Sequence, residues 1–122
     1  MSGNIYVGNA GKDAPLDSGW LLGHFKEADD PRHTDAVEVK WGIHPQGDER
    51  PEWVRGDERT ALLVLVSGRF RVEFPERSVL LEQQGDYVVW GPGVDHSWFA
   101  EEESVLVTVR WPSVSGYAVA RE

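Results

Sequence analysis

The chain contains no cysteine and one methionine, and basic residues are in the minority. Without cysteine, neither a disulfide framework nor a thiolate metal site can form, and a reducing compartment is permitted. Twelve Lys and Arg stand against twenty-one Asp and Glu, which gives a formal net charge of -9. A charge of this sign repels nucleic-acid phosphates and anionic lipid, so neither nucleic acid nor a membrane is expected as a partner.

Long hydrophobic runs are also missing. No apolar segment approaches the length of about 18 residues that crosses a membrane, and the N-terminus lacks the charged start and apolar run of a signal peptide. We therefore expect a cytoplasmic protein. The length of 122 residues fits one domain, and we place the whole chain, 1–122, in it.

The apolar stretches are short, rich in Val, Leu and aromatic residues, and bounded by Gly, Pro or Asp, which is typical of strands joined by turns. Residues 37–43 and 105–111 alternate apolar and polar side chains, so each is predicted to be a strand with one apolar face. Residues 61–66 form a continuous apolar run, typical of a strand covered on both faces. Further strands are expected at 69–74, 78–82, 87–90 and 96–99.

No helical pattern separates these strands, so the sequence predicts an all-β fold, either a sandwich or a closed barrel. The first 35 residues contain two polar loops with proline, at 13–18 and 27–34. We expect residues 1–35 to wrap the barrel or a partner, and residues 36–122 to form the barrel core.

Residues 85–100 follow a glycine and histidine pattern, G-x5-P-x-G-x2-H-x3-N, in which Gly91 and Ala100 replace the proline and the asparagine. The outer glycines and His96 are kept. In this pattern the chain resembles the cupin superfamily, and in particular a subgroup of small bacterial cupins without an assigned activity. The resemblance implies a single cupin-type β-barrel, that is, a double-stranded β-helix or jelly roll.

The first cupin motif, G-x5-H-x-H-x3-4-E-x6-G, keeps its outline here but loses its ligands. Counting from Gly47 places Trp53 and Arg55 where the family has two histidines. Counting back from Gly68 places Ala61 where the family has its glutamate. The resemblance therefore implies that three of the family's four metal ligands are absent.

His96 occupies the position that coordinates metal in metal-binding cupins. A catalytic metal usually has three protein ligands, so one imidazole is not enough. We therefore expect no metal ligands and no cofactor, and keep as an alternative a divalent metal held by His96, His44 and an acid. His96 is otherwise a general acid or base, since imidazole titrates near neutrality, or a structural histidine hydrogen-bonded inside the barrel.

Trp53 and Arg55 are two residues apart on one strand, as are His96 and Trp98 on another, so each pair shares a face. With the spacing of the cupin motifs, all four side chains face one cavity, and Trp90 forms part of its wall. Arg55 would bind a carboxylate or phosphate, and the tryptophans would enclose a ring or a sugar. The opposing interpretation is an internal ion pair of Arg55 with a nearby acid, and tryptophans that only fill the core.

Three functions stay open, and with them the question of whether the protein is an enzyme. The first, which we favour, is a metal-independent small-molecule-binding cupin. The second is an isomerase, epimerase, cyclase or lyase in which His96 moves a proton. The third is a metal-dependent oxygenase or isomerase with unusual ligands. Because the apolar faces of 37–43 and 105–111 could extend beyond one core, a homodimer is expected.

Overall fold

The structure is a computed structural model, and we describe residues 4–114 of it. The elements are, in chain order, α1 (Ala10–Asp13), the 3-10 turn η1 (Ala14–Asp17), β1 (Trp20–Leu22), β2 (Glu38–His44), β3 (Thr60–Ser67), β4 (Phe70–Glu73), β5 (Ser78–Leu81), β6 (Tyr87–Trp90), β7 (Ser97–Ala100) and β8 (Ser104–Trp111). All seven strands expected from the sequence are present.

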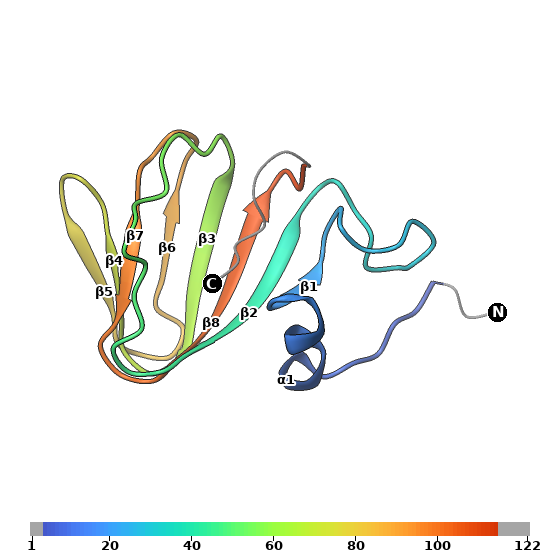
Figure 1. Cartoon of the computed structure of the whole chain (residues 1–122), viewed down its shortest axis with the longest axis horizontal. Coiled ribbons are helices and arrows are strands. Elements are labelled where there is room, and N and C mark those ends of the chain that lie inside the picture. The colour runs from blue at the N-terminus through green and yellow to red at the C-terminus, as the bar shows by residue number, and fades with distance from the viewer. Residues whose placement is uncertain (1–3, 115–122) are drawn as a thin grey trace.

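The strands form two antiparallel sheets (Figure 1). The larger sheet has the order β1-β2-β8-β3-β6, and the smaller has the order β5-β4-β7. Consecutive strands therefore alternate between the sheets over much of the chain, which is the connectivity of a jelly roll. The predicted all-β barrel is confirmed.

The core lies between the two sheets. Period-two alternation turns Leu63 and Leu65 of β3 inward, where they meet Phe70 and Val72 of β4. Gly68 makes the turn between these strands with φ of 102°, and a Cβ there would lie 2.2 Å from a backbone oxygen, so only glycine fits. The buried cluster is completed by Leu81, Ala100 and Leu106.

The larger sheet also carries apolar side chains on the side away from this core. On β2 the polar set faces inward, since Glu38 is fully buried and His44 packs against Phe70, whereas Ile43 is 56% exposed. On β6, Tyr87 is 65% exposed. We call this surface the outer face; it consists of Val39, Trp41, Ile43, Thr60, Leu62, Val64, Tyr87, Val89, Val105, Val107, Val109 and Trp111, which the strand register places together.

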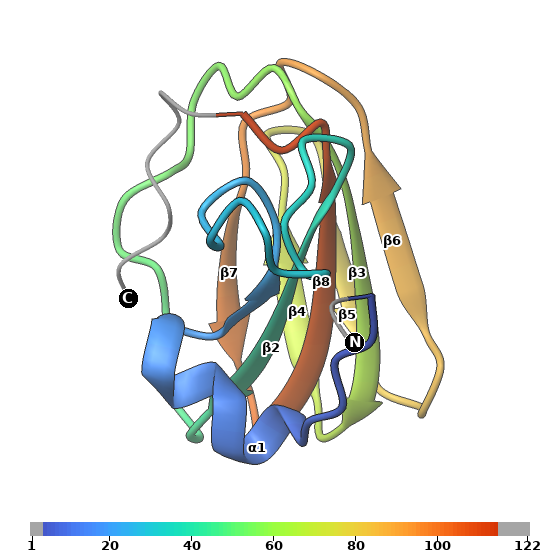
Figure 2. The same ribbon diagram turned by 90° about the vertical axis from the view of Figure 1, so that its right-hand side faces the viewer.

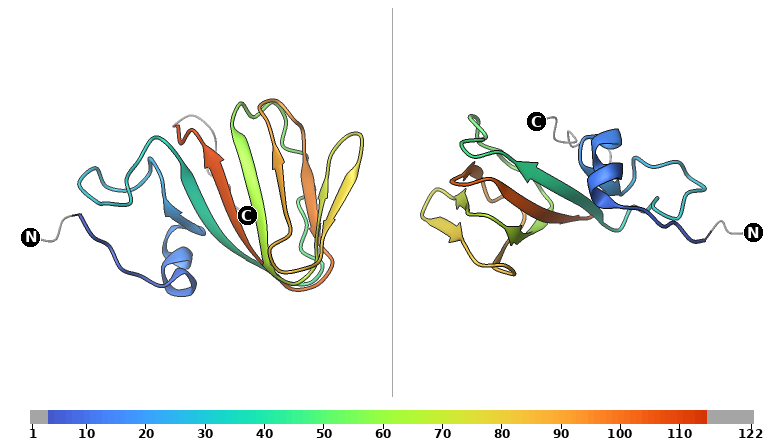
Figure 3. Two further views of the ribbon diagram at one scale, coloured as in Figure 1. Left: turned by 180° about the vertical axis from the view of Figure 1, so that it is seen from behind. Right: turned by 90° about the horizontal axis from the view of Figure 1, so that it is seen from below.

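The N-terminal part lies to one side of the barrel, where α1 and η1 sit beside the end of β2 (Figure 2) and β1 pairs with β2. The loop after β1 extends further from the barrel (Figure 3). The segment expected as a loop at 13–18 is a helical turn instead, because Pro15 stands at the start of η1, where its fixed φ favours helix and its missing N–H costs nothing. No helix within residues 4–114 has the length and apolarity to span a membrane.

Residues 47–54 run beside β7 without forming a regular strand. Isolated bridges pair Glu49 with Phe99 and Val54 with His96. The register slips between the two bridges, where Pro51 has no N–H to donate to a ladder. This segment extends the smaller sheet and brings the chain to His96.

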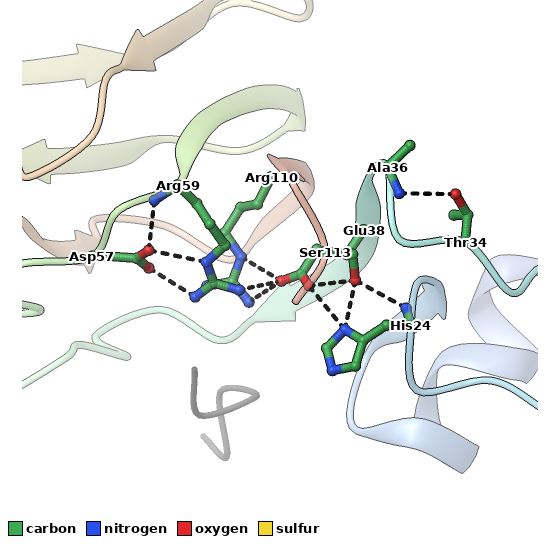
Figure 4. Close-up of polar contacts among 8 residues, drawn as sticks. All are labelled: His24, Thr34, Ala36, Glu38, Asp57, Arg59, Arg110 and Ser113. Carbon is green, nitrogen blue, oxygen red and sulfur yellow. Dashed lines mark hydrogen bonds and ion pairs between the residues drawn. The ribbon is translucent and has the colours of Figure 1, made fainter. Parts of the chain in front are cut away.

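A buried ion cluster joins β2 and β8 to the start of β3 (Figure 4). The Glu38 carboxylate has no exposed surface. Its Oε2 accepts hydrogen bonds from Arg59 at 2.6 Å and from Nε of Arg110 at 2.9 Å, and its Oε1 accepts one from the Ser113 hydroxyl at 2.9 Å. A second carboxylate, Asp57, binds the Arg59 guanidinium through both oxygens at 2.9 and 2.7 Å. The cluster thus pairs two carboxylates with two guanidinium groups.

Removing the central carboxylate should destabilise the fold strongly. Glu38→Ala leaves Arg59 and Arg110 buried beside each other without their shared counterion, and breaking a buried pair in this way costs about 3–5 kcal/mol. We expect a loss of that size in the free energy of unfolding from urea titration. Glu52→Ala, which removes an exposed carboxylate, is the control and should change stability little. Equal stabilities of the two variants would contradict the role given to the cluster.

Candidate functional site

His96 stands at the start of β7, directly opposite Val54. The Val54 N–H donates to the His96 carbonyl at 2.8 Å, and the His96 N–H donates to the Val54 carbonyl at 3.1 Å. Residues paired in this way have side chains on the same face of a sheet. Their neighbour on the same face of β7 is Trp98, which contacts the core residue Phe70, so His96 faces the barrel interior.

The hydrogen bonding of His96 defines its tautomer. Nδ1 lies 3.1 Å from the carbonyl oxygen of Val94. Because a carbonyl oxygen only accepts, Nδ1 carries the hydrogen, and in the neutral ring Nε2 keeps a lone pair. Trp90 packs on the imidazole with a centroid separation of 4.6 Å. His96 therefore presents a hydrogen-bond acceptor beside an indole ring.

The surroundings favour the neutral imidazole. Burial lowers the pKa of His96, and this effect outweighs the hydrogen bond to Val94 and the Asp57 carboxylate, which both act to raise it. The guanidinium groups of Arg50 and Arg110 lower it further. For Asp57 itself, burial acts to raise the pKa, but the hydrogen bonds from Arg59 prevail and leave the pKa below its usual value. The imidazole thus lies near a carboxylate that stays ionised.

A groove of about 580 Å³ opens between the turn after β4 and the loop after β6. Trp90 lines the groove, and its ring also contacts Phe74, with ring centroids 5.5 Å apart. Most of the lining is apolar, with Glu76, Arg77 and Asp95 as the charged members. The groove thus begins at the ring that packs on His96. Its remaining lining residues are Pro75, Val79, Val88, Val89, Gly91, Gly93 and Val94.

The prediction that Trp53 and Arg55 face the barrel interior is wrong. Because Val54 shares a face with His96, the two residues flanking Val54 face the other way. The Arg55 side chain is 71% exposed, and its NH1 lies 3.2 Å from the Asp95 carboxylate. The partner is thus an acid, as in the opposing interpretation, but the pair lies at the surface. The motif count placed Trp53 and Arg55 on the side of His96, whereas the residue bridged to His96 is Val54.

The three other predicted site residues lie on the interior side. Trp90 and His96 are brought together, whereas Trp98 packs in the core against Phe70, with ring centroids 5.3 Å apart, and edge-on against His44 at 4.6 Å. Trp98 does not line the groove. His44 lies by Trp98, so it is not part of the His96 and Trp90 pair.

The residues near His96 do not fit a metal ion. Within residues 4–114, no three His, Asp or Glu side chains gather in a way that could hold one. Nδ1 of His96 is committed to a carbonyl, and the residue opposite, Val54, has no donor atom. The Asp57 carboxylate, which acts on the charge of His96, is bound by Arg59. The usual cupin donor set is not reproduced around His96.

The sequence reasoning missed the ion cluster and the groove. Glu38, Arg59 and Arg110 are far apart in the chain and follow no motif spacing. The sequence held one signal for Glu38. This residue is one of the polar side chains that alternate with apolar ones along β2, and the apolar ones form part of the outer face. Arg77, a groove residue, stands in a turn predicted only as a connection.

Known structures identify the fold. No family model matches the chain, and no curated protein does. Among solved structures, the chain is similar to an RmlC-like cupin from Shewanella frigidimarina, with 18% identity over 70% of this chain and 74% of that one and a TM-score of 0.61. KdgF from Halomonas sp. is similar with 21% identity, 66% and 73% coverage and a TM-score of 0.59.

A cupin-2 domain protein from Shewanella frigidimarina extends the likeness over most of the chain, with 16% identity over 84% of this chain and 92% of that one and a TM-score of 0.57. At these identities the comparisons define the fold alone. The chain has the fold of a small cupin domain, as the resemblance implied. No activity follows from the fold.

His96 should titrate below the value of about 6.5 that is usual for histidine. The unfolded chain then takes up this proton at a higher pH than the folded chain, so stability is full above about pH 6.5 and falls as the pH decreases towards the folded pKa. NMR titration of the ring gives the pKa directly. In urea unfolding, wild type should lose more stability between pH 7.5 and 5.5 than His96→Gln. A pKa of 6.5 or above, or identical losses, would contradict the lowered pKa.

Proposed function

We propose that this chain is a metal-independent cupin that binds a small molecule carrying a ring and an anionic group. The observation that carries the proposal is the position of Trp90, which lines the groove and packs on His96 at 4.6 Å. A groove of about 580 Å³ is within the range of ligand pockets, which are mostly apolar with a few polar groups. The location proposed for the protein is the cytoplasm, whose reducing conditions suit a chain without cysteine.

The lining supports this class of ligand. Trp90 and Phe74 offer aromatic surfaces on which a ring packs favourably. Arg77 is the cation of the lining, and its planar fork binds carboxylate or phosphate. Arg77 takes the anchoring role first given to Arg55, whose guanidinium is paired with Asp95. His96 does not line the groove itself; it packs on Trp90 and helps to fix the indole there.

A second candidate function is acid–base catalysis at the same place. It is favoured by the lone pair on Nε2 of a neutral His96, which is the form that removes a proton. Such a reaction would be an isomerisation, epimerisation, cyclisation or elimination. The two functions differ in what His96→Gln does: it leaves ligand binding largely intact in the first, and abolishes turnover of a bound ligand in the second.

Ligand binding should depend on Trp90. In a fluorescence screen with a panel of aromatic carboxylates, we expect at least one saturable ligand. Trp90→Leu should weaken it tenfold or more, because about 1.4 kcal/mol of ring contact is lost. Trp111→Leu removes an outer-face tryptophan and is the matched control, with affinity unchanged. A panel without any saturable ligand, or the same affinity in both variants, would refute the groove as the binding site.

We also propose a homodimer that pairs the outer faces of two chains. An eight-residue strand such as β8 is about 26 Å long and four strands are about 19 Å wide, so the face covers on the order of 500 Å². Apolar patches of this size mark interaction sites. Every outer-face residue is uncharged. Since each chain carries -9, a neutral face is where a second copy approaches with least repulsion.

Sedimentation velocity tests the dimer. Wild type should sediment at twice the chain mass of 13.7 kDa. Val107→Lys puts a charge near the middle of the outer face and should shift the protein to monomer, because two buried like charges would meet across a two-fold interface. Glu102→Lys, in an exposed turn, makes a larger change in net charge and should remain dimeric. A monomeric wild type would refute the proposal.

A further inference from the structure

A second hollow, separate from the groove at Trp90, lies between the N-terminal helical turn and the edge of β2. Its volume is about 360 Å³. Ala14 and Pro15 of η1 form one wall, and β2 residues from Lys40 to His44 form the other. We call it the N-terminal hollow. The remaining lining residues are Gly11, Ser18, Gly19 and Asp48.

His44 and Asp48 form a hydrogen-bonded pair in the lining. Nδ1 of His44 lies 2.8 Å from Oδ2 of Asp48, and the His44 side chain is only 12% exposed. A carboxylate accepts the hydrogen, so Nδ1 carries it, and in the neutral ring Nε2 is an acceptor. One face of the imidazole is held by Trp98, at a centroid distance of 4.6 Å. The ring is thus fixed both in position and in tautomer.

Gly42 makes room for this imidazole. A Cβ built on Gly42 would lie 2.9 Å from Nε2 of His44, closer than real side chains approach. Gly42 and His44 are two residues apart and therefore lie on the same, inward side of β2, and both line the hollow. Nε2 of His44 therefore lies beside Gly42, another residue of the hollow lining.

Hydrogen-bond donors lie further along β2. Lys40 also lines the hollow and stands four residues before His44, about 13 Å away along the strand. Its ammonium lies 5.5 Å from the centroid of the Trp20 ring. Trp41 donates its N–H to Gly19 on this edge at 2.8 Å. By the alternation of an antiparallel strand the Ile43 N–H points to the same edge, where no strand of residues 4–114 continues the sheet.

We propose that the N-terminal hollow binds a small carboxylic acid with a hydroxyl group at its far end. The donor at one end, Lys40, matches the carboxylate, and the Ile43 N–H, one residue from His44, can donate to the hydroxyl oxygen at the other. The acceptor, Nε2 of His44, matches the hydroxyl. The apolar wall of Ala14 and Pro15 matches a hydrocarbon or aryl body between them. Asp48 acts as a positioning residue, because it orients the His44 ring.

The probe is 3-(4-hydroxyphenyl)propionate, added to the full chain and followed by backbone amide NMR. We expect saturable shifts at Gly19, Gly42, Ile43 and His44. Two matched compounds separate the contacts: 3-phenylpropionate lacks the hydroxyl, and 3-(4-hydroxyphenyl)propionamide lacks the charge. Each should bind at least fivefold more weakly than the probe. Saturable shifts at Trp90 and Val94 in place of the β2 residues would assign the probe to the groove and overturn the proposal.

Variants complete the test. Gly42→Ala forces the imidazole to move and should weaken the probe tenfold or more. Glu52→Ala is the control, since Glu52 is exposed and lines neither the groove nor the N-terminal hollow, and it should bind as wild type does. His44→Phe keeps an aromatic ring against Trp98 and should bind the probe and 3-phenylpropionate equally. Unchanged affinity in Gly42→Ala, or unchanged preference for the hydroxyl in His44→Phe, would also overturn the proposal.

Discussion

The carboxylate of Glu38 is the constraint around which the larger sheet is organised. It is fully buried and is shared by two guanidinium groups, from Arg59 before β3 and Arg110 on β8. A buried charge is tolerated only when it is paired and hydrogen-bonded, so these partners have to be kept in place together. On the N-terminal side, Ser113 donates to Glu38 and accepts from the backbone N–H of His24 at 2.9 Å. One carboxylate thus ties the barrel to the loop after β1.

This arrangement decides which way β2 faces. With Glu38 inward, period two also turns Lys40, Gly42 and His44 inward and leaves the apolar set outside. The same strand therefore supplies one residue of the ion cluster, one wall of the N-terminal hollow and part of the uncharged outer face. In the larger sheet the core is polar near Glu38 and apolar near Leu65.

The sequence was sufficient for the strands and for the loop that contains His96. Short β-rich runs between Gly, Pro and Asp predicted β2 to β8 but not β1, and the glycine pattern placed His96 beside Trp90. It was not sufficient for Trp53 and Arg55, because residues 47–54 form no regular strand and the motif spacing does not show that Val54, and not its two neighbours, is the residue bridged to His96. Nor did it give the ion cluster, whose members meet only once β2, β8 and the start of β3 are adjacent. The alternation in β2 was recognised, but alternation alone does not say which face is buried.

The charges inside the barrel explain why this interior differs from a metal site. Arginine on both carboxylates leaves His96 without anionic neighbours that are available to coordinate a metal. The most direct test is plasma mass spectrometry on untagged wild-type protein. We expect far less than one equivalent of iron, manganese, nickel or zinc per chain, and the same unfolding temperature with and without a chelator. Near one equivalent of any of these metals, lost in His96→Ala, would contradict this interpretation of the barrel.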